Sequence, residues 1–130
     1  MANKDLKIVR APERESVPCP FTIKIVGASS AANNVVTIEH GRGIVDSVSR
    51  TGTGEIKVLL KDKWTHLLSC SVSLQSSSDR AARLLAHNVS GATPYMTFNT
   101  ISDALAPEDT PNSGTDYIHV VAWMKNSSVF

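Results

Sequence analysis

Hydrophobic and polar residues alternate along residues 43–75, with glycine-rich turns between the alternating runs. The clearest run is 67–75, in which four apolar residues alternate with four polar ones: Leu68, Cys70, Val72 and Leu74 against Ser69, Ser71, Ser73 and Gln75. Successive side chains of a strand point to opposite faces of its sheet, so this period of two predicts strands with one buried face and one wet face. Residues 43–75 therefore predict three consecutive strands of an antiparallel sheet.

The rest of the chain shows short apolar or alternating runs of the same kind, separated by turns. We predict strands at residues 21–27, 35–39, 43–50, 54–60, 67–75, 81–89, 95–101 and 116–124. The composition of residues 81–89 also permits a helix, and we favour a strand because the segments on both sides are strands.

Short strands in series, without a long amphipathic helix, are typical of an all-β fold with two packed antiparallel sheets. We predict a two-sheet β-sandwich with jelly-roll topology. Strands near both ends of the chain suit a fold in which the first and last strands pair centrally.

Residues 1–20 differ from the remainder, since they mix charged residues with Pro12, Pro18 and Pro20. Only residues 6–9 have the composition of a short strand, and proline lacks the N–H donor that a central strand needs. We predict an extended N-terminal arm at 1–20 and one sandwich domain at 21–130. The alternative is a frayed terminus held by one edge strand.

The composition of the 130-residue chain excludes several classes of protein. A net charge of +1 does not suit a nucleic-acid binder, and no apolar run approaches the ~18 residues of a membrane span. Two cysteines, Cys19 and Cys70, are too few for a disulfide framework or a metal site. The two could form a disulfide, but reduced thiols in a protein made in the cytoplasm are the simpler interpretation. We expect Cys70 to pack as a small hydrophobic side chain on the buried face of its strand.

Charge is unevenly distributed along the chain. Residues 1–83 hold twelve Lys and Arg against eight Asp and Glu, whereas residues 84–130 hold one against four. Such asymmetry can orient one copy against another, although ordinary solvated charge is the simpler interpretation.

No motif indicates an enzyme or a cofactor. A Gly-x-Ser-x-Gly nucleophile elbow is absent, and the four histidines are scattered singly. A sheet would have to bring His87 and His119 together to form a metal site. The acids Asp103, Glu108 and Asp109 share a loop but lack calcium-loop spacing. We expect a protein that is not an enzyme and that binds neither a metal nor a cofactor.

Residues 43–75 and 116–130 resemble small virion proteins of tailed bacteriophages. The shared features are a Gly-x-Gly turn at 52–54, a Lys-Asp-Lys-Trp corner at 61–64, and a strand ending in Leu-Gln at 74–75. The final strand and its Asn-Ser-Ser tail at 126–128 match the closing strand of those proteins. The resemblance covers roughly half of the chain, and its motifs are structural.

The resemblance implies a head decoration, or cement, protein of a short-tailed phage. Such a protein binds the outer lattice of the major capsid protein on the virion and stabilises the head, after synthesis in the host cytoplasm. It implies the major capsid protein as partner and a homo-oligomer on the capsid, with no nucleic acid and no membrane. From composition we expect the contacts in the arm and the last strand: Leu6, Ile8, Val9, Arg10, Arg14, Tyr117 and Trp123.

Two other functions remain open from the sequence. One is a carbohydrate-binding or receptor-binding module that stacks a glycan on Trp64 or Tyr95, since aromatic rings can serve as a platform for sugars. Core packing is the simpler role for Trp64. The other is a tail-associated structural protein, which the sequence does not distinguish from a head protein.

Overall fold

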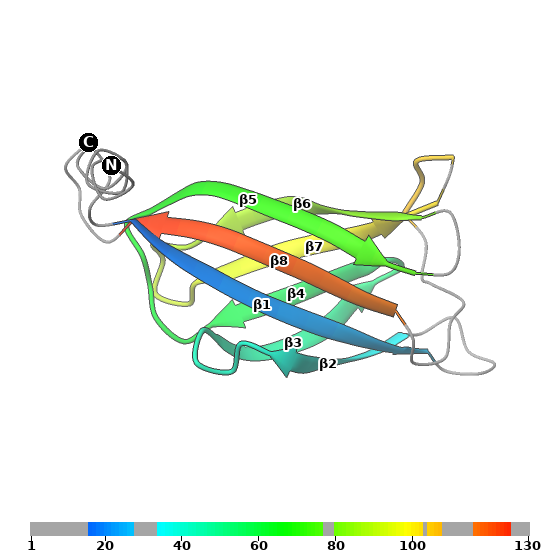
Figure 1. The fold of residues 1–130 in the computed structure, drawn as a ribbon, viewed down its shortest axis with the longest axis horizontal. Coiled ribbons are helices and arrows are strands. Elements are labelled where there is room, and N and C mark those ends of the chain that lie inside the picture. Colours follow the sequence, from blue (N-terminus) through cyan, green and yellow to red (C-terminus); the bar gives the residue numbers. More distant parts are fainter. Residues whose placement is uncertain (1–15, 28–33, 77–79, 103, 108–115, 126–130) are drawn as a thin grey trace, which may run out of the picture.

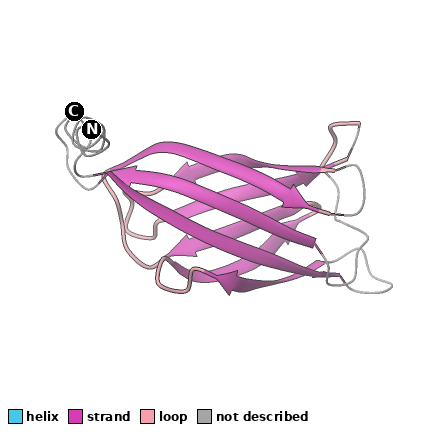
Figure 2. Cartoon of the chain, viewed as in Figure 1, coloured by secondary structure: helices cyan, strands magenta, loops and turns pink. Residues whose placement is uncertain are grey.

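A computed structural model describes residues 16–27, 34–76, 80–102, 104–107 and 116–125 of the chain. Within these ranges the protein consists of strands and connecting loops, without helix (Figure 2). Two antiparallel sheets of four strands each pack as two layers (Figure 1). The predicted all-β fold with two antiparallel sheets is therefore confirmed.

All eight segments predicted as strands are strands, including the ambiguous segment that begins at Ala81. Their bounds are β1 (Ser16–Gly27), β2 (Asn34–His40), β3 (Val45–Gly52), β4 (Glu55–Leu60), β5 (His66–Gln75), β6 (Ala81–Asn88), β7 (Tyr95–Ile101) and β8 (Asp116–Lys125).

One sheet has the order β2-β1-β8-β5 and the other the order β3-β4-β7-β6. They are called here the β1–β8 sheet and the β4–β7 sheet, after their central strands. The first and last strands of the described chain thus pair in the middle of one sheet, as predicted.

The jelly-roll topology is not confirmed by this strand order. A jelly roll contains two Greek keys. In the described strands β8 pairs with β5 and β7 pairs with β6, whereas β5 and β6 belong to different sheets and are neighbours only where these sheets adjoin. The other strands form the hairpins β1–β2 and β3–β4, each within a single sheet.

The first strand begins earlier than the sequence predicted. Residues 16–20 of the predicted arm belong to β1 and pair with β8 from Ser16, opposite Lys125, to Pro20, opposite Val121. β2 pairs with β1 only from Thr22 onward, so residues 16–21 of β1 have β8 as their one partner among the described strands. A strand segment paired on one side can accommodate proline, because its other side needs no N–H donor. Residues 1–15, which hold the rest of the predicted arm, lie outside the described residues.

The core between the sheets is largely aliphatic, as the low aromatic content requires. Phe21 of β1 and Phe98 of β7 meet edge to face across the two layers, with ring centroids 6.0 Å apart. Burying a side chain of this class contributes about 1.5–3 kcal/mol. The side chains with no more than 1% of their surface exposed include Ile23, Ile25, Val45, Val58, Met96, Phe98, Ile118, Val120 and Met124.

Candidate binding face of the β1–β8 sheet

The β1–β8 sheet has an outer face that points away from the core. Every second side chain of β1 and β8 lies on this face, because successive side chains of a strand point to opposite sides of the sheet. Because Ile118, Val120 and Ala122 are buried, the odd-numbered residues of β8 from 117 to 123 lie on the opposite face. Cross-strand pairing aligns them in four rows with β1: Lys24–Tyr117, Thr22–His119, Pro20–Val121 and Pro18–Trp123. β5 extends the same rows with Gln75, Ser73, Ser71 and Ser69.

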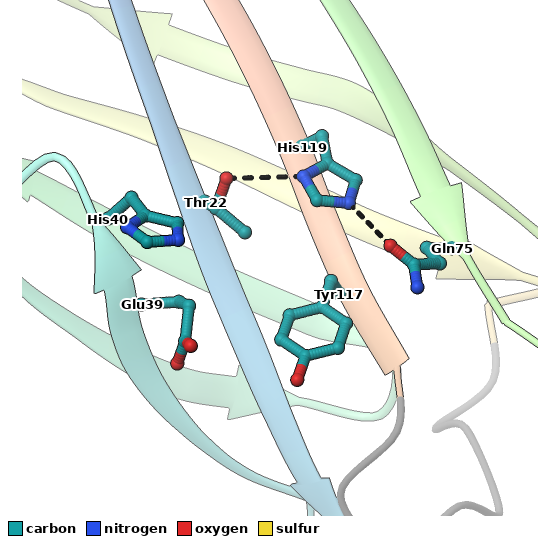
Figure 3. A pocket seen from close by; sticks show the side chains of 6 residues that line it. All are labelled: Thr22, Glu39, His40, Gln75, Tyr117 and His119. Atoms are coloured by element: carbon teal, nitrogen blue, oxygen red, sulfur yellow. Dashed lines mark hydrogen bonds between the residues drawn. The ribbon is translucent and has the colours of Figure 1, made fainter.

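A polar pocket of about 320 Å³ occupies one half of this face. Its side chains come from four strands (Figure 3), of which β1 and β2 are consecutive and β5 and β8 are distant in sequence. They are Thr22 (β1), Glu39 and His40 (β2), Gln75 (β5), and Tyr117 and His119 (β8).

His119 is held at both ring nitrogens (Figure 3). Its Nδ1 lies 3.2 Å from the Thr22 hydroxyl and its Nε2 lies 2.9 Å from Gln75 Oε1. A neutral ring that donates from Nε2 to the Gln75 carbonyl oxygen accepts the Thr22 hydroxyl proton at Nδ1. These two bonds fix the orientation of the ring and of the Gln75 amide.

Tyr117 lies next to this histidine. The two rings are nearly parallel, with centroids 6.0 Å apart and an interplanar angle of 17°. The Lys24 ammonium lies 5.9 Å from the Tyr117 centroid, at the outer limit of a cation–π contact. The Tyr117 ring thus has a histidine and a lysine as neighbours, each about 6 Å from its centre.

The other half of the face is an apolar patch, defined by Pro18, Pro20, Val121 and Trp123. Trp123 is 42% exposed and Val121 is 39% exposed, although both lie on the central strand of the sheet. A hollow of about 490 Å³ adjoins the patch. It shares Thr22, His40 and His119 with the polar pocket, so the two hollows are adjacent.

Two of the predicted interface residues, Tyr117 and Trp123, lie on this face, six positions apart on β8. The other five, Leu6, Ile8, Val9, Arg10 and Arg14, lie outside the described residues. The two residues named as a possible glycan platform, Trp64 and Tyr95, are both partly buried. Trp64 is partly buried against the core, and the Lys57 ammonium lies 4.4 Å from the Tyr95 centroid.

His87 and His119, the two histidines that a sheet would have to bring together for a metal site, lie on different sheets. His87 lies on β6 of the β4–β7 sheet, whereas His119 faces outward from the β1–β8 sheet. No group of three His, Cys, Asp or Glu side chains in the described part of the chain is arranged to hold a metal ion. Asp103, Glu108 and Asp109 lie outside the described residues.

The two cysteines are free and flank one residue of β8. Cys19 of β1 and Cys70 of β5 both pair with Ala122, which places them two strand spacings apart, about 9.6 Å. A disulfide needs Cα atoms closer than about 7 Å. Burial raises the pKa of the Cys19 thiol and raises the pKa of Cys70 to about 11. Thiolate, the nucleophilic form, is therefore scarce at neutral pH.

Sequence reasoning missed the polar pocket. Of its six residues, only Tyr117 is predicted from the sequence to take part in binding, as an interface residue. The available signal was the odd-numbered alternation of residues 117–123, which places Tyr117 and His119 on one face. Residues Thr22, Glu39, His40 and Gln75 join them only through strand pairing.

Comparisons of the chain with protein-family models, curated proteins and solved structures found no match. None of the described residues belongs to a helix that could cross a membrane.

Proposed function

We propose that this protein is a capsid decoration protein of a short-tailed bacteriophage. In this proposal it binds the major capsid protein through the apolar patch, as a homo-oligomer on the virion surface. The proposal is supported by the resemblance of residues 43–75 and 116–130 to small phage virion proteins. The observation that carries it is the exposed Trp123 on a central, doubly paired strand, beside Val121, Pro18 and Pro20.

An exposed tryptophan on a rigid strand suits a binding hot spot. Tryptophan is enriched among the few residues that dominate binding energy, and a fixed backbone reduces the entropy lost on association. Val121 and the two prolines extend the patch with side chains that lose little freedom when buried. An apolar sheet face with an exposed tryptophan suits contact with a folded subunit of the capsid.

Binding of this kind stabilises the capsid by mass action. A ligand that binds the assembled shell and not the separated subunits adds free energy in proportion to the logarithm of its concentration over Kd. Copies at symmetry-related sites that also contact one another gain avidity. No chemical step is required of the protein.

The test is co-sedimentation of the purified protein with empty, expanded capsids of short-tailed phages. We expect about one copy per shell subunit at saturation. Trp123→Ala should weaken binding by about 30-fold, since a hot-spot residue contributes about 2 kcal/mol or more. Its thermal stability should remain close to that of the unmodified protein, because the indole is substantially exposed.

Leu85→Ala provides the matched control. Leu85 is 46% exposed on β6 of the other sheet, so its removal should leave capsid binding unchanged. Equal binding by Trp123→Ala and the unmodified protein would exclude the apolar patch as the contact. A few copies per particle would instead indicate a tail-associated protein.

A further inference from the structure

We infer that the polar pocket on the outer face of the β1–β8 sheet is a saccharide-binding site. This site lies apart from the predicted platform of Trp64 and Tyr95. It is also independent of the capsid proposal, which uses the apolar patch at the other end of β8.

The groups around the pocket match the chemistry of neighbouring hydroxyl groups, each of which donates and accepts. The Glu39 carboxylate supplies acceptors, the Gln75 amide supplies donors, and the Tyr117 hydroxyl supplies both. The Tyr117 ring adds an aromatic surface for the C–H face of a sugar. Sugars present these two features together, apolar faces with hydroxyl groups at the edge.

The pocket is organised before a ligand arrives. The Gln75 carbonyl oxygen is engaged by His119 Nε2 at 2.9 Å, which leaves the amide N–H groups to donate outward. His119 is in turn held by Thr22 at 3.2 Å. Among the described residues, no hydrogen bond joins the Glu39 carboxylate or the Tyr117 hydroxyl to another side chain. These groups are positioned on strands and are available to a ligand.

Figure 3 shows the arrangement of the six side chains. Glu39 and His40 lie on one side of β1, and Tyr117, His119 and Gln75 lie on the other, with Thr22 between them. A ligand across β1 can therefore contact Glu39 and Tyr117 at the same time. A volume of about 320 Å³ is at the small end of ligand pockets, which suits a mono- or disaccharide.

Other ligand classes fit the pocket less well. An anion would meet the Glu39 carboxylate, and a metal would need ligands that the described residues do not group together. The Glu39 carboxylate in the pocket lining and the Lys24 ammonium beside Tyr117 are of opposite sign. A neutral, hydroxyl-rich ligand is not repelled by the Glu39 carboxylate and does not need a cluster of metal-binding side chains.

Trp123, the centre of the apolar patch, lies far enough from the polar pocket for the two to act separately. Trp123 lies four residues along β8 from His119 and six from Tyr117, and a strand rises about 3.3 Å per residue. The separations are therefore roughly 13 and 20 Å. A small sugar in the polar pocket need not touch Trp123.

The test is a titration of the ¹⁵N-labelled full chain with D-glucose, D-galactose, N-acetyl-D-glucosamine and lactose, together with a glycan array. We expect at least one saccharide to give saturable amide shifts that map to residues around the pocket on β1, β2, β5 and β8. Gln75→Ala and Tyr117→Ala should each weaken that binding at least tenfold. Gln75 is exposed, so its variant tests the site even if Tyr117→Ala folds poorly.

Two control variants separate this inference from the capsid proposal. Tyr95→Ala removes a tyrosine from the other sheet, and Trp123→Ala removes the centre of the apolar patch; both should bind the saccharide normally. The inference is overturned if no saccharide binds, if Gln75→Ala and Tyr117→Ala bind as the unmodified protein does, or if the shifts centre on Trp123.

Discussion

Gly41 shows how one residue shapes both the core and the candidate face. It follows β2 with φ at +96°, a conformation that costs other residues energy. A Cβ built at this position would lie 2.4 Å from Phe21 Cβ, so the turn packs directly on β1. The Gly41 carbonyl accepts hydrogen bonds from the Ile44 and Val45 amides, each at 2.9 Å. This turn follows His40, which lines the polar pocket.

Replacing Gly41 with alanine should destabilise the protein by about 2–4 kcal/mol, because backbone strain and overlap with Phe21 act together. Gly43→Ala is the matched control in the same turn. A Cβ at Gly43 has no atom within 4 Å, and we expect a change within about 1 kcal/mol. Urea denaturation of both variants measures the difference. Equal effects would contradict this account of the turn.

At the scale of elements, β8 organises the β1–β8 sheet. It pairs with β1 from Asp116 to Lys125 and with β5 from Tyr117 to Lys125. Its buried residues alternate with exposed or partly exposed ones from 116 to 123. One strand thus contributes side chains both to the core of the domain and to the centre of its candidate binding face.

Adjacent valines on β8 test this division. Val120 is 1% exposed and Val121 is 39% exposed. We expect Val120→Ala to lower the free energy of unfolding by about 2 kcal/mol, because it removes buried methyl groups and leaves a cavity. Val121→Ala should change it by no more than about 0.5 kcal/mol. Chemical denaturation gives both values, and a larger loss at Val121 would reverse the assignment of the two faces.

At the scale of the whole molecule, the central pairing of β1 and β8 brings both ends of the described domain together. Ser16 is opposite Lys125, two positions from the Pro18–Trp123 pair. Figure 1 shows the start of β1 beside the end of β8. Residues 1–15 are therefore joined to the domain at the end that carries the apolar patch. This placement supports the proposal that the predicted arm adds contacts to the capsid.

Deleting residues 1–15 tests the arm without removing any residue of β1, which begins at Ser16. We expect the truncated protein to keep its thermal stability within a few degrees. Occupancy on expanded capsids should fall, because the contacts proposed for Leu6, Ile8, Val9, Arg10 and Arg14 are lost. Full occupancy by the truncated protein would show that the arm is dispensable.

The strands were predictable wherever local pattern and burial agree. The alternation at 70–75 and the apolar run at 116–124 mark β5 and β8, because every second side chain of these strands is directed to the core. The alternation predicted for Leu68 is wrong: the register of β5 against β8 shifts between Leu67 and Ser69, and Leu68 is 37% exposed. The predicted start of β1, at residue 21, was wrong. Pro18 and Pro20 indicate the absence of a strand, except where one side of the strand has no partner to receive the missing N–H donor. Whether a strand is paired on one side or on both depends on the order of strands in the sheet, and the local sequence does not show this order.

The sequence by itself determined the all-β class, the position of every described strand to within a few residues except at the start of β1, and the alternation that separates core from surface. These depend on neighbouring residues, whose side chains must alternate to bury one face. Only the tertiary structure decided the strand order. That order places Thr22, Glu39, Gln75 and His119 around one pocket. Pairing between distant strands depends on how the whole core packs, and no local pattern encodes it.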